Sequence, residues 1–287
     1  MKARIIDGRA TAKKVKAEVK AVTDVLRKED KRPPCLSVIL AGEDPASAIY
    51  VRNKEKACKA NGILSVKHAL PEDVSAEKLE EVIRALNEDE RVDGILLQLP
   101  LPDHLNDRQA YFLNLIRPDK DVDGFHPLNV GRLTLGLDAP VACTPYGCMR
   151  LLEETGEDLE GKLALVIGRS NTVGKPMIQL LLQKNATVIV AHSRTKNLPE
   201  LSRQADIIIA AVGQSEFLSG DMVKEGVIVI DVGINRQENG KLLGDVNFPE
   251  VSEKASYITT VPGGVGPMTV AMLLKNTLKC YEMHNLA

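Results

Sequence analysis

Residues 166–176 read VIGRSNTVGKP, in which the end of an apolar run leads into a glycine turn and then into the start of a helix. The apolar run at 163–167 is typical of a buried parallel strand. Gly168, Ser170 and Gly174 leave room for the backbone to close on a pyrophosphate, whose negative charge the N-terminus of the following helix would favour. The spacing departs from G-x-G-x-x-G, and tight strand-helix turns also occur without a ligand, so the turn alone leaves both interpretations open.

The next predicted strand, 186–191, ends in the sequence HSRTK at 192–196. An NAD site usually carries an Asp or Glu about 20 residues beyond the glycines, where it holds the ribose 2′-hydroxyl. This segment has no acid and offers instead Ser193, Arg194 and Lys196, which suit a 2′-phosphate that an Arg can hold by two hydrogen bonds. An isolated S-R-x-K is better explained as a solvated basic turn, but at the end of the second strand of a nucleotide unit we expect NADP.

Composition excludes several classes of protein. The chain has 287 residues, a net charge of −2, 44% apolar and 26% charged residues, which is typical of a water-soluble enzyme with one large or two medium domains. It lacks the basic face that nucleic acid or an anionic membrane needs, an apolar run of about 20 residues and a secretory signal. The five scattered cysteines fit reduced thiols, and no Cys-His cluster has metal spacing. We therefore expect a cytoplasmic protein without a bound metal.

Strands and helices alternate on both sides of the glycine turn. Before the turn we expect strands at 36–40, 65–70 and 94–97 and helices at 12–26, 47–61, 75–87 and 106–116. After it we expect strands at 163–167, 187–191, 207–210, 227–231 and 257–260, a hairpin between Asn235 and Asp245, and a last helix at 268–281. This repetition predicts mostly parallel sheets covered by helices on both faces, with the last helix packing back on the N-terminal half.

Three polar residues before the glycine turn are candidates for chemistry. Tyr50 and Lys54 lie four residues apart in the predicted helix 47–61 and therefore share one helix face. A Tyr hydroxyl beside a Lys ammonium can hold or pass a proton, although most Y-x-x-x-K pairs are ordinary surface pairs. Gln98 follows the strand 94–97 at its carboxyl end, where α/β sheets bind ligands. A strand cap at a proline turn explains Gln98 equally well.

Two loops are also candidates. Residues 118–127 read PDKDVDGFHP, with three carboxylates in five residues around Lys120. These could ligate a metal, without EF-hand spacing, or form a solvated turn. Asp121 or Asp123 could instead accept paired N–H donors from a planar heterocycle. In the loop 261–269, VPGGVGPMT, glycines permit close approach of a flat ligand and prolines limit the freedom of the backbone.

In combination these segments closely resemble the bifunctional methylenetetrahydrofolate dehydrogenase/methenyltetrahydrofolate cyclohydrolase family over nearly the whole chain. Each motif alone could be chance, but all of them in this order are specific. The motifs are DPASAIYVRNK at 44–54, DGILLQLPLP at 93–102, KDVDGF at 120–125, CTP at 143–145, GRSN at 168–171 and PGGVGPMT at 262–269.

The resemblance implies that Lys54 is the central catalytic residue of both reactions, that Tyr50 packs against the substrate, and that Gln98 orients Lys54 by a hydrogen bond. It also implies binding roles for the following residues: for the substrate, Tyr50, Asp121, Pro262, Gly263 and Gly264; for the dinucleotide phosphates, Gly168, Arg169 and Ser170; for the 2′-phosphate, Ser193 and Arg194; and for the nicotinamide end, Ile234.

The fold that follows is α/β with two α/β domains and a substrate cleft between them. We expect a discontinuous folate-binding catalytic domain, 1–143 plus 268–287, and a Rossmann-type NADP-binding domain, 144–267. The expected activity is oxidation of 5,10-methylenetetrahydrofolate to 5,10-methenyltetrahydrofolate with NADP⁺, followed by hydrolysis to 10-formyltetrahydrofolate. The expected partners are tetrahydrofolate derivatives and a second copy of the chain in a homodimer, without nucleic acid or membrane.

Three rival interpretations differ in testable ways. Short-chain dehydrogenases also use Y-x-x-x-K, but there the pair follows the nucleotide glycines, whereas Tyr50 and Lys54 precede Gly168. A monofunctional dehydrogenase of the same family would lack hydrolysis, against which the presence of Lys54 and Gln98 argues. A non-enzymatic NADP sensor would bind the cofactor tightly without turning over folate.

Overall fold

The computed structural model describes residues 2–285, without the side chains of Pro45 and Ala46. The chain forms two compact units. Unit 1 contains the residues up to Lys13 together with Ala142–Thr269, and unit 2 contains Lys14–Val141 together with the residues from Val270 onward. The sequence-based division placed the first residues in the other domain. They lie in unit 1 because strand β1 (Arg4–Ile6) pairs in parallel with β11 (Tyr257–Thr259).

Unit 1 is built on a six-stranded sheet in the order β1-β11-β8-β7-β5-β6, with every neighbouring pair parallel. A parallel sheet needs both faces covered, which explains why its strands are continuous apolar runs. The central strands are β5 (Leu163–Ile167), β7 (Ile207–Ala210) and β8 (Ile228–Asp231), and β6 (Thr187–Ala191) lies at one edge. All four begin and end within one residue of the predicted positions.

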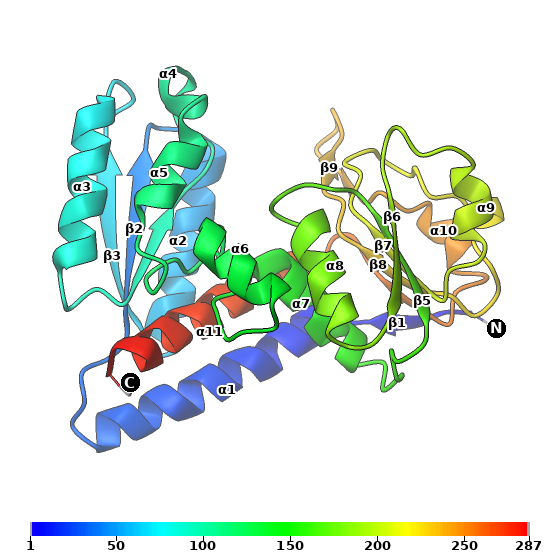
Figure 1. Cartoon of the computed structure of the whole chain (residues 1–287), viewed down its shortest axis with the longest axis horizontal. Helices are drawn as coiled ribbons and strands as arrows, with labels where there is room; N and C mark the ends of the chain where they lie inside the picture. Colours follow the sequence, from blue (N-terminus) through cyan, green and yellow to red (C-terminus); the bar gives the residue numbers. More distant parts are fainter. Residues whose placement is uncertain (1, 286–287) are drawn as a thin grey trace. The chain divides into compact units, whose positions relative to one another are not determined.

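Helices cover both faces of this sheet (Figure 1). One face carries α9, η1 and α10, whose apolar residues join a buried cluster with Ile208, Val229 and Ile258. The other carries α7 and α8. The bounds are α7 (Cys143–Glu153), α8 (Gly174–Leu182), α9 (Leu198–Ser202), η1 (Gly220–Met222) and α10 (Phe248–Val251). The predicted hairpin is present as the antiparallel pair β9 (Asn235–Arg236) and β10 (Leu242–Leu243).

Unit 2 contains a parallel three-stranded sheet in the order β3-β2-β4. The strands are β2 (Cys35–Ala41), β3 (Leu64–Leu70) and β4 (Gly94–Leu97). Ile39, Ile95 and Leu97 face a core shared with α3 (Ala76–Glu88) and α5 (Gln109–Leu115), where Phe112 is completely buried. The alternate side chains of the strands point to the opposite face. No helix in residues 2–285 is long and apolar enough to span a membrane.

The remaining helices of unit 2 partly differ from the prediction. The helix expected at 106–116 corresponds to α5, and a further short helix, α4 (Asp103–Asn106), precedes it. Helix α6 (Pro127–Thr134) was not predicted; it is a short helix that His126 caps by accepting the N–H of Leu128. Helix α2 (Pro45–Ala60) lies wholly in unit 2, whereas α1 (Gly8–Lys28) and α11 (Val265–Asn285) begin in unit 1 and continue in unit 2.

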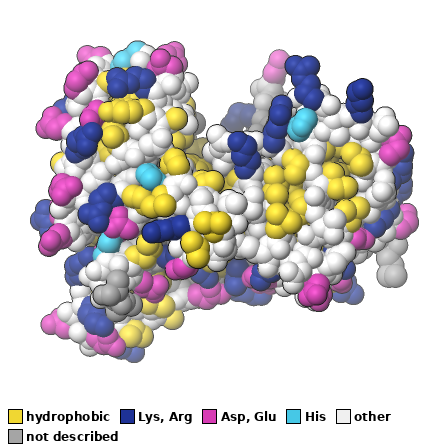
Figure 2. All heavy atoms as spheres, in the orientation of Figure 1, with side chains coloured by type: hydrophobic (Ala, Val, Ile, Leu, Met, Phe, Trp, Pro, Cys, Tyr) yellow, Lys and Arg dark blue, Asp and Glu magenta, His cyan; other side chains and the backbone are white. Residues whose placement is uncertain are grey.

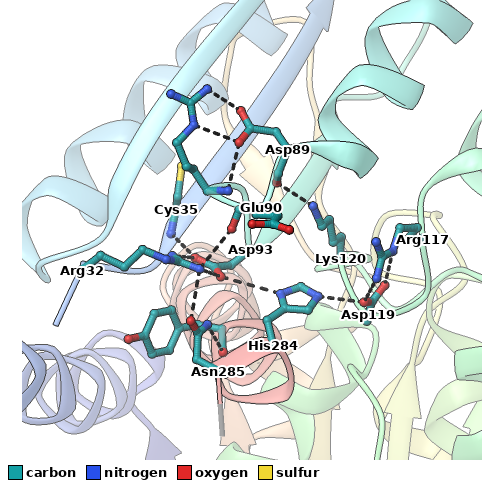
Figure 3. Close-up of polar contacts among 12 residues, drawn as sticks. Arg32, Cys35, Asp89, Glu90, Asp93, Arg117, Asp119, Lys120, His284 and Asn285 are labelled. Carbon is teal, nitrogen blue, oxygen red and sulfur yellow. Dashed lines mark hydrogen bonds and ion pairs between the residues drawn. The ribbon is translucent and has the colours of Figure 1, made fainter. Parts of the chain in front are cut away.

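Helix α11 is held by polar contacts with segments of unit 2 that lie outside the strands. Asn276 donates two 2.7 Å hydrogen bonds from Nδ2, to the carbonyls of Val122 and Val141. At the end of the helix, His284 lies between two carboxylates, Asp93 and Asp119 (Figure 3). The last helix therefore packs on the N-terminal half, as predicted, and one of its contacts is with the loop that contains Asp121 and Asp123.

Candidate active site

Lys54 is held by a glutamine at the end of a neighbouring strand. Helix α2 begins at a capping carboxylate, Asp44, which accepts the N–H of Ser47 at 2.7 Å. One helical turn after Tyr50, the Nζ of Lys54 donates to Oε1 of Gln98 at 2.9 Å. Gln98 is buried and donates its own Nε2 to the carbonyl of Leu99 at 2.6 Å, which sets the direction of its amide. The ammonium has three donors, so two stay available to other acceptors.

Tyr50 lies on the same face of α2 as Lys54 and is 54% exposed. Among the described residues its hydroxyl makes no hydrogen bond to Lys54, so the side chain is free to pack against a ligand. The structure thus brings Lys54 and Gln98 into contact and places Tyr50 one turn away on an exposed surface.

The two aspartates of the 120–125 loop have different surroundings. Asp121 is 3% exposed, and its Oδ2 accepts the N–H of His126 at 2.8 Å and Nδ2 of Asn129 at 3.0 Å. Burial raises the pKa of its carboxyl. Its two hydrogen bonds hold the loop in shape. Asp123 makes no side-chain hydrogen bond within the described part of the chain, and it lies close enough for the charge of Lys54 to act on it.

Asp123 is the freer of the two acids to meet a ligand. Burial raises the pKa of Asp123 to about 6, and the nearby Lys54 ammonium opposes that rise. The loop is held beside β4, since Ile95 donates its N–H to the carbonyl of Lys120 at 2.7 Å. Sequence reasoning from the residues left Asp121 and Asp123 open, and the resemblance selected Asp121. They differ in the two hydrogen bonds that Oδ2 of Asp121 already accepts, which the linear sequence does not display.

The glycine turn of unit 1 is closely packed. Gly168 has φ 137° and donates its N–H to the carbonyl of Ala191 at 2.8 Å. A Cβ on Gly168 would overlap the carbonyl of Ala211, and a Cβ on Gly174 would overlap the carbonyl of Gly168. Ser170 accepts the N–H groups of Val173 (3.1 Å) and Gly174 (3.3 Å), so its hydroxyl shapes the start of α8. Arg169 and Ser170 are exposed at this helix N-terminus, which favours an anion.

The basic turn after β6 presents its side chains to solvent. His192 and Thr195 close the turn, because His192 donates its N–H to Oγ1 of Thr195 and accepts the N–H of Thr195 on its carbonyl, both at 2.8 Å. Nδ1 of His192 also accepts the N–H of Arg194. Ser193 and Arg194 are exposed at its tip. Since β5 and β6 pair in register up to Ile167 and Ala191, the turn begins level with Gly168.

Ile234 and the Pro262-Gly263-Gly264 loop also belong to unit 1. Ile234 follows β8 and is 54% exposed. Gly263 has φ 115°, in the region that favours glycine, and a Cβ on Gly264 would lie 2.7 Å from the carbonyl of Thr260. No cluster of His, Cys, Asp and Glu among the described residues is arranged to hold a metal.

Comparison with known proteins finds one family for both halves of the chain. Residues 6–123 match the model of the tetrahydrofolate dehydrogenase/cyclohydrolase catalytic domain, and residues 142–285 match the model of the NAD(P)-binding domain of the same family. The chain belongs to the tetrahydrofolate dehydrogenase/cyclohydrolase family. The family predicted from the residues is confirmed, as is a fold of two α/β domains of which one binds NAD(P).

Relatives of this family are similar over their full length. The bifunctional protein FolD of Campylobacter hominis is 56% identical over 276 residues, covering 96% of both chains, and that of Moorella thermoacetica is 53% identical over 279 residues, covering 97% of this chain and 99% of the other. The crystal structure of bifunctional FolD from Campylobacter jejuni has TM-score 0.94 and 52% identity, covering 98% and 99%. The Trypanosoma brucei FolD complexed with NADP and an inhibitor has TM-score 0.92 and 40% identity, covering all of both chains.

Proposed function

We propose that this chain oxidises 5,10-methylenetetrahydrofolate with NADP⁺ and hydrolyses the methenyl product to 10-formyltetrahydrofolate. The observation that carries the proposal is the Lys54–Gln98 contact within the unit that contains most of the family's catalytic domain. The relatives are named bifunctional, and one is described in complex with NADP. The reaction belongs to one-carbon folate interconversion.

The residues of unit 1 fit a dinucleotide with a 2′-phosphate. Gly168, Arg169 and Ser170 would hold the phosphates before α8, where the glycines let the backbone approach closely and the helix N-terminus favours an anion. Ser193 and Arg194, exposed beyond β6, would hold the 2′-phosphate, and Ile234 would contact the nicotinamide end. Figure 2 shows Lys and Arg side chains gathered with a histidine on this unit, a charge distribution suited to phosphates. The bound cofactor supplies the hydride acceptor.

In the dehydrogenase step the protein mainly orients the substrate. The lone pairs of two folate nitrogens assist departure of hydride from the methylene carbon between them, so no strong base is needed. Tyr50 offers a flat exposed ring on α2 against which the pterin can pack. We assign the amino-pyrimidine edge of the pterin to Asp123, because Asp121 already accepts His126 and Asn129. The resemblance also assigns Pro262, Gly263 and Gly264 of unit 1 to folate binding.

In the cyclohydrolase step Lys54 carries the chemistry. Water attacks the methenyl carbon, and the tetrahedral intermediate then needs a proton moved to the departing nitrogen. Gln98 holds Lys54 by accepting one of its three N–H donors, and the remaining donors can stabilise the developing charge. Lys54 is half-buried, which limits competition from bulk water for those donors.

We also propose a cytoplasmic homodimer that pairs through unit 1. Strand β6 lies at the edge of the six-stranded sheet, so one side of its backbone has no neighbouring strand among residues 2–285. Val188, Ile189 and Val190 are only partly buried, and Figure 2 shows apolar side chains over this part of the unit. Pairing of two copies about a two-fold axis beside β6 would cover the open side of the strand and its apolar side chains. The five free cysteines are buried, as suits a reducing compartment.

The experiment is one incubation with methylenetetrahydrofolate and either NADP⁺ or NAD⁺, following reduced cofactor, methenyl and 10-formyl folate together. Joint rise of NADPH and 10-formyl folate with little free methenyl supports the proposal. Accumulation of methenyl folate would make the chain a monofunctional dehydrogenase. Tight NADP⁺ binding without turnover would make it a cofactor-binding protein, and equal use of NAD⁺ would remove Ser193 and Arg194 from a 2′-phosphate site.

A further inference from the structure

Asp245 of unit 1 is a completely buried carboxylate that gathers four N–H donors. Its Oδ2 accepts the backbone N–H groups of Val212 at 2.5 Å and Gly213 at 2.9 Å, and its Oδ1 accepts that of Gln214 at 3.0 Å. Oδ1 also accepts Nδ2 of Asn235 at 2.9 Å. A single side chain therefore holds two loops that are far apart in the sequence.

Both loops leave the carboxyl ends of central strands. Residues 211–214 follow β7, and residues 232–234 follow β8 and lead into Asn235 at the start of β9. In open α/β sheets this edge is where ligands bind. The first loop packs directly against the glycine turn, since a Cβ on Gly168 would overlap the carbonyl of Ala211. The second contains Ile234, which is exposed. Asp245 thus connects the backbone beside the phosphate turn to the residue that we place at the nicotinamide end.

A second buried acid holds Asp245 itself. Asp231, at the end of β8, accepts the N–H groups of Gly233 (3.0 Å) and Asp245 (2.9 Å) on Oδ1 and that of Val246 (3.1 Å) on Oδ2. A Cβ on Gly233 would overlap the carboxylate of Asp245, and a Cβ on Gly244 would overlap that of Asp231. The backbone around the two acids is therefore shaped to enclose them.

Neither acid is in an ion pair within the described residues. Burying a carboxylate is costly unless hydrogen bonds compensate it. Here the compensation comes from backbone and amide N–H groups, each of which must point at the carboxylate. The arrangement consequently fixes the course of the loops, because a shift of either loop would leave a buried charge without donors.

We propose that Asp245 is a positioning residue for the dinucleotide, which holds the 212–214 backbone and Ile234 in the shape that receives the cofactor. The proposal rests on the NADP-dependent function above. It predicts that loss of the Asp245 charge damages the dehydrogenase reaction selectively, because the cyclohydrolase residues Lys54 and Gln98 lie in unit 2.

The test is Asp245→Asn, in which one oxygen becomes an NH₂ group that faces N–H donors. We expect KM for NADP⁺, and the dissociation constant of NADPH followed by its fluorescence, to rise about tenfold or more. Cyclohydrolase turnover of methenyltetrahydrofolate, measured without nucleotide, should stay within about twofold of the wild type. The matched control is Asp221→Asn, an exposed acid of the same unit that accepts Ser219 and should change neither reaction.

Asn235→Ala keeps the test decisive if Asp245→Asn fails to fold. It removes a single donor to Asp245, and KM for NADP⁺ should rise by about threefold with cyclohydrolase turnover unchanged. Equal losses of both reactions in the folded variants, or unaltered NADPH binding, would overturn the positioning role. Failure of the proposed function itself is seen separately, as absence of NADP⁺-dependent turnover in the wild-type protein.

Discussion

Replacement of His284 by glutamine should remove part of the pH dependence of stability. His284 is 18% exposed near the end of α11, where Nε2 contacts Oδ2 of Asp119 at 2.8 Å and Nδ1 lies 3.7 Å from Oδ1 of Asp93 (Figure 3). The hydrogen bond to Asp119 and the nearby carboxylate of Asp93 raise the pKa of His284 from 6.5 to about 8. Arg32 pairs with Asp93 and Arg117 with Asp119, which reduces the attraction of the two carboxylates for a charged His284 without cancelling it.

The size and sign of the effect follow from this rise. At about 1.36 kcal/mol per pKa unit, a rise from 6.5 to about 8 corresponds to about 2 kcal/mol. Because the folded-state pKa of His284 is raised, its contribution is fully present below the unfolded pKa of about 6.5 and is lost as pH rises through about 8. Between pH 6 and 9, wild-type protein should therefore lose about 1–2 kcal/mol more unfolding free energy than the His284→Gln variant.

The assay is urea unfolding of both proteins at pH 6 and pH 9. The change in unfolding free energy between the two pH values is compared between wild type and variant, so that the contributions of other titrating groups cancel. His68→Gln is the matched control, because burial lowers the pKa of His68 and its removal should change the pH dependence in the opposite direction. If wild type and His284→Gln lose the same free energy over this range, His284 is not a charged clamp between Asp93 and Asp119.

Three further predictions concern the active site. Lys54→Met should abolish cyclohydrolase turnover while folate still binds, and near-normal hydrolysis would contradict the role of Lys54. Arg194→Ala should weaken NADP⁺ binding by about 10- to 100-fold and NAD⁺ far less, as measured by the two dissociation constants; equal losses would exclude a 2′-phosphate contact. Asp123→Asn should raise KM for methylenetetrahydrofolate about tenfold with an unchanged melting temperature, whereas Asp121→Asn should lower the melting temperature; the reverse pattern would return the pterin to Asp121.

The strands of both sheets were the most predictable part of the fold, since β2, β4, β5 and β7 all lie within one residue of the expected positions. Strands β5 and β7 are short apolar runs buried in a parallel sheet, and such runs can be recognised without knowledge of their neighbours. The three-residue strand β1 could not be recognised from the sequence, because only its pairing with β11 makes it a strand. That pairing also explains why the first residues join unit 1 and not the domain that follows them in sequence.

The contact between Lys54 and Gln98 illustrates what spacing can reveal. Lys54 could be placed on the helix face of Tyr50 by periodicity, and Gln98 at a strand's carboxyl end by the run of apolar residues before it. Their hydrogen bond came from the family resemblance and not from either pattern. The hydrogen bonds to Asp245 could not be predicted in this way. Val212, Gly213 and Gln214 donate through the backbone, so their residue types give no indication of the contact.

The choice between Asp121 and Asp123 shows why two neighbouring acids of one motif cannot be ranked by chemistry alone. Both are carboxylates in the same loop, and either can accept paired N–H donors from a heterocycle. Their roles separate where the chain turns back at His126 and Asn129, whose N–H groups occupy Asp121 and leave Asp123 to face Lys54. Two N–H donors already occupy Oδ2 of Asp121, whereas Asp123 accepts none within the described residues and lies near Lys54, so Asp123 is the acid to which we expect the substrate to bind.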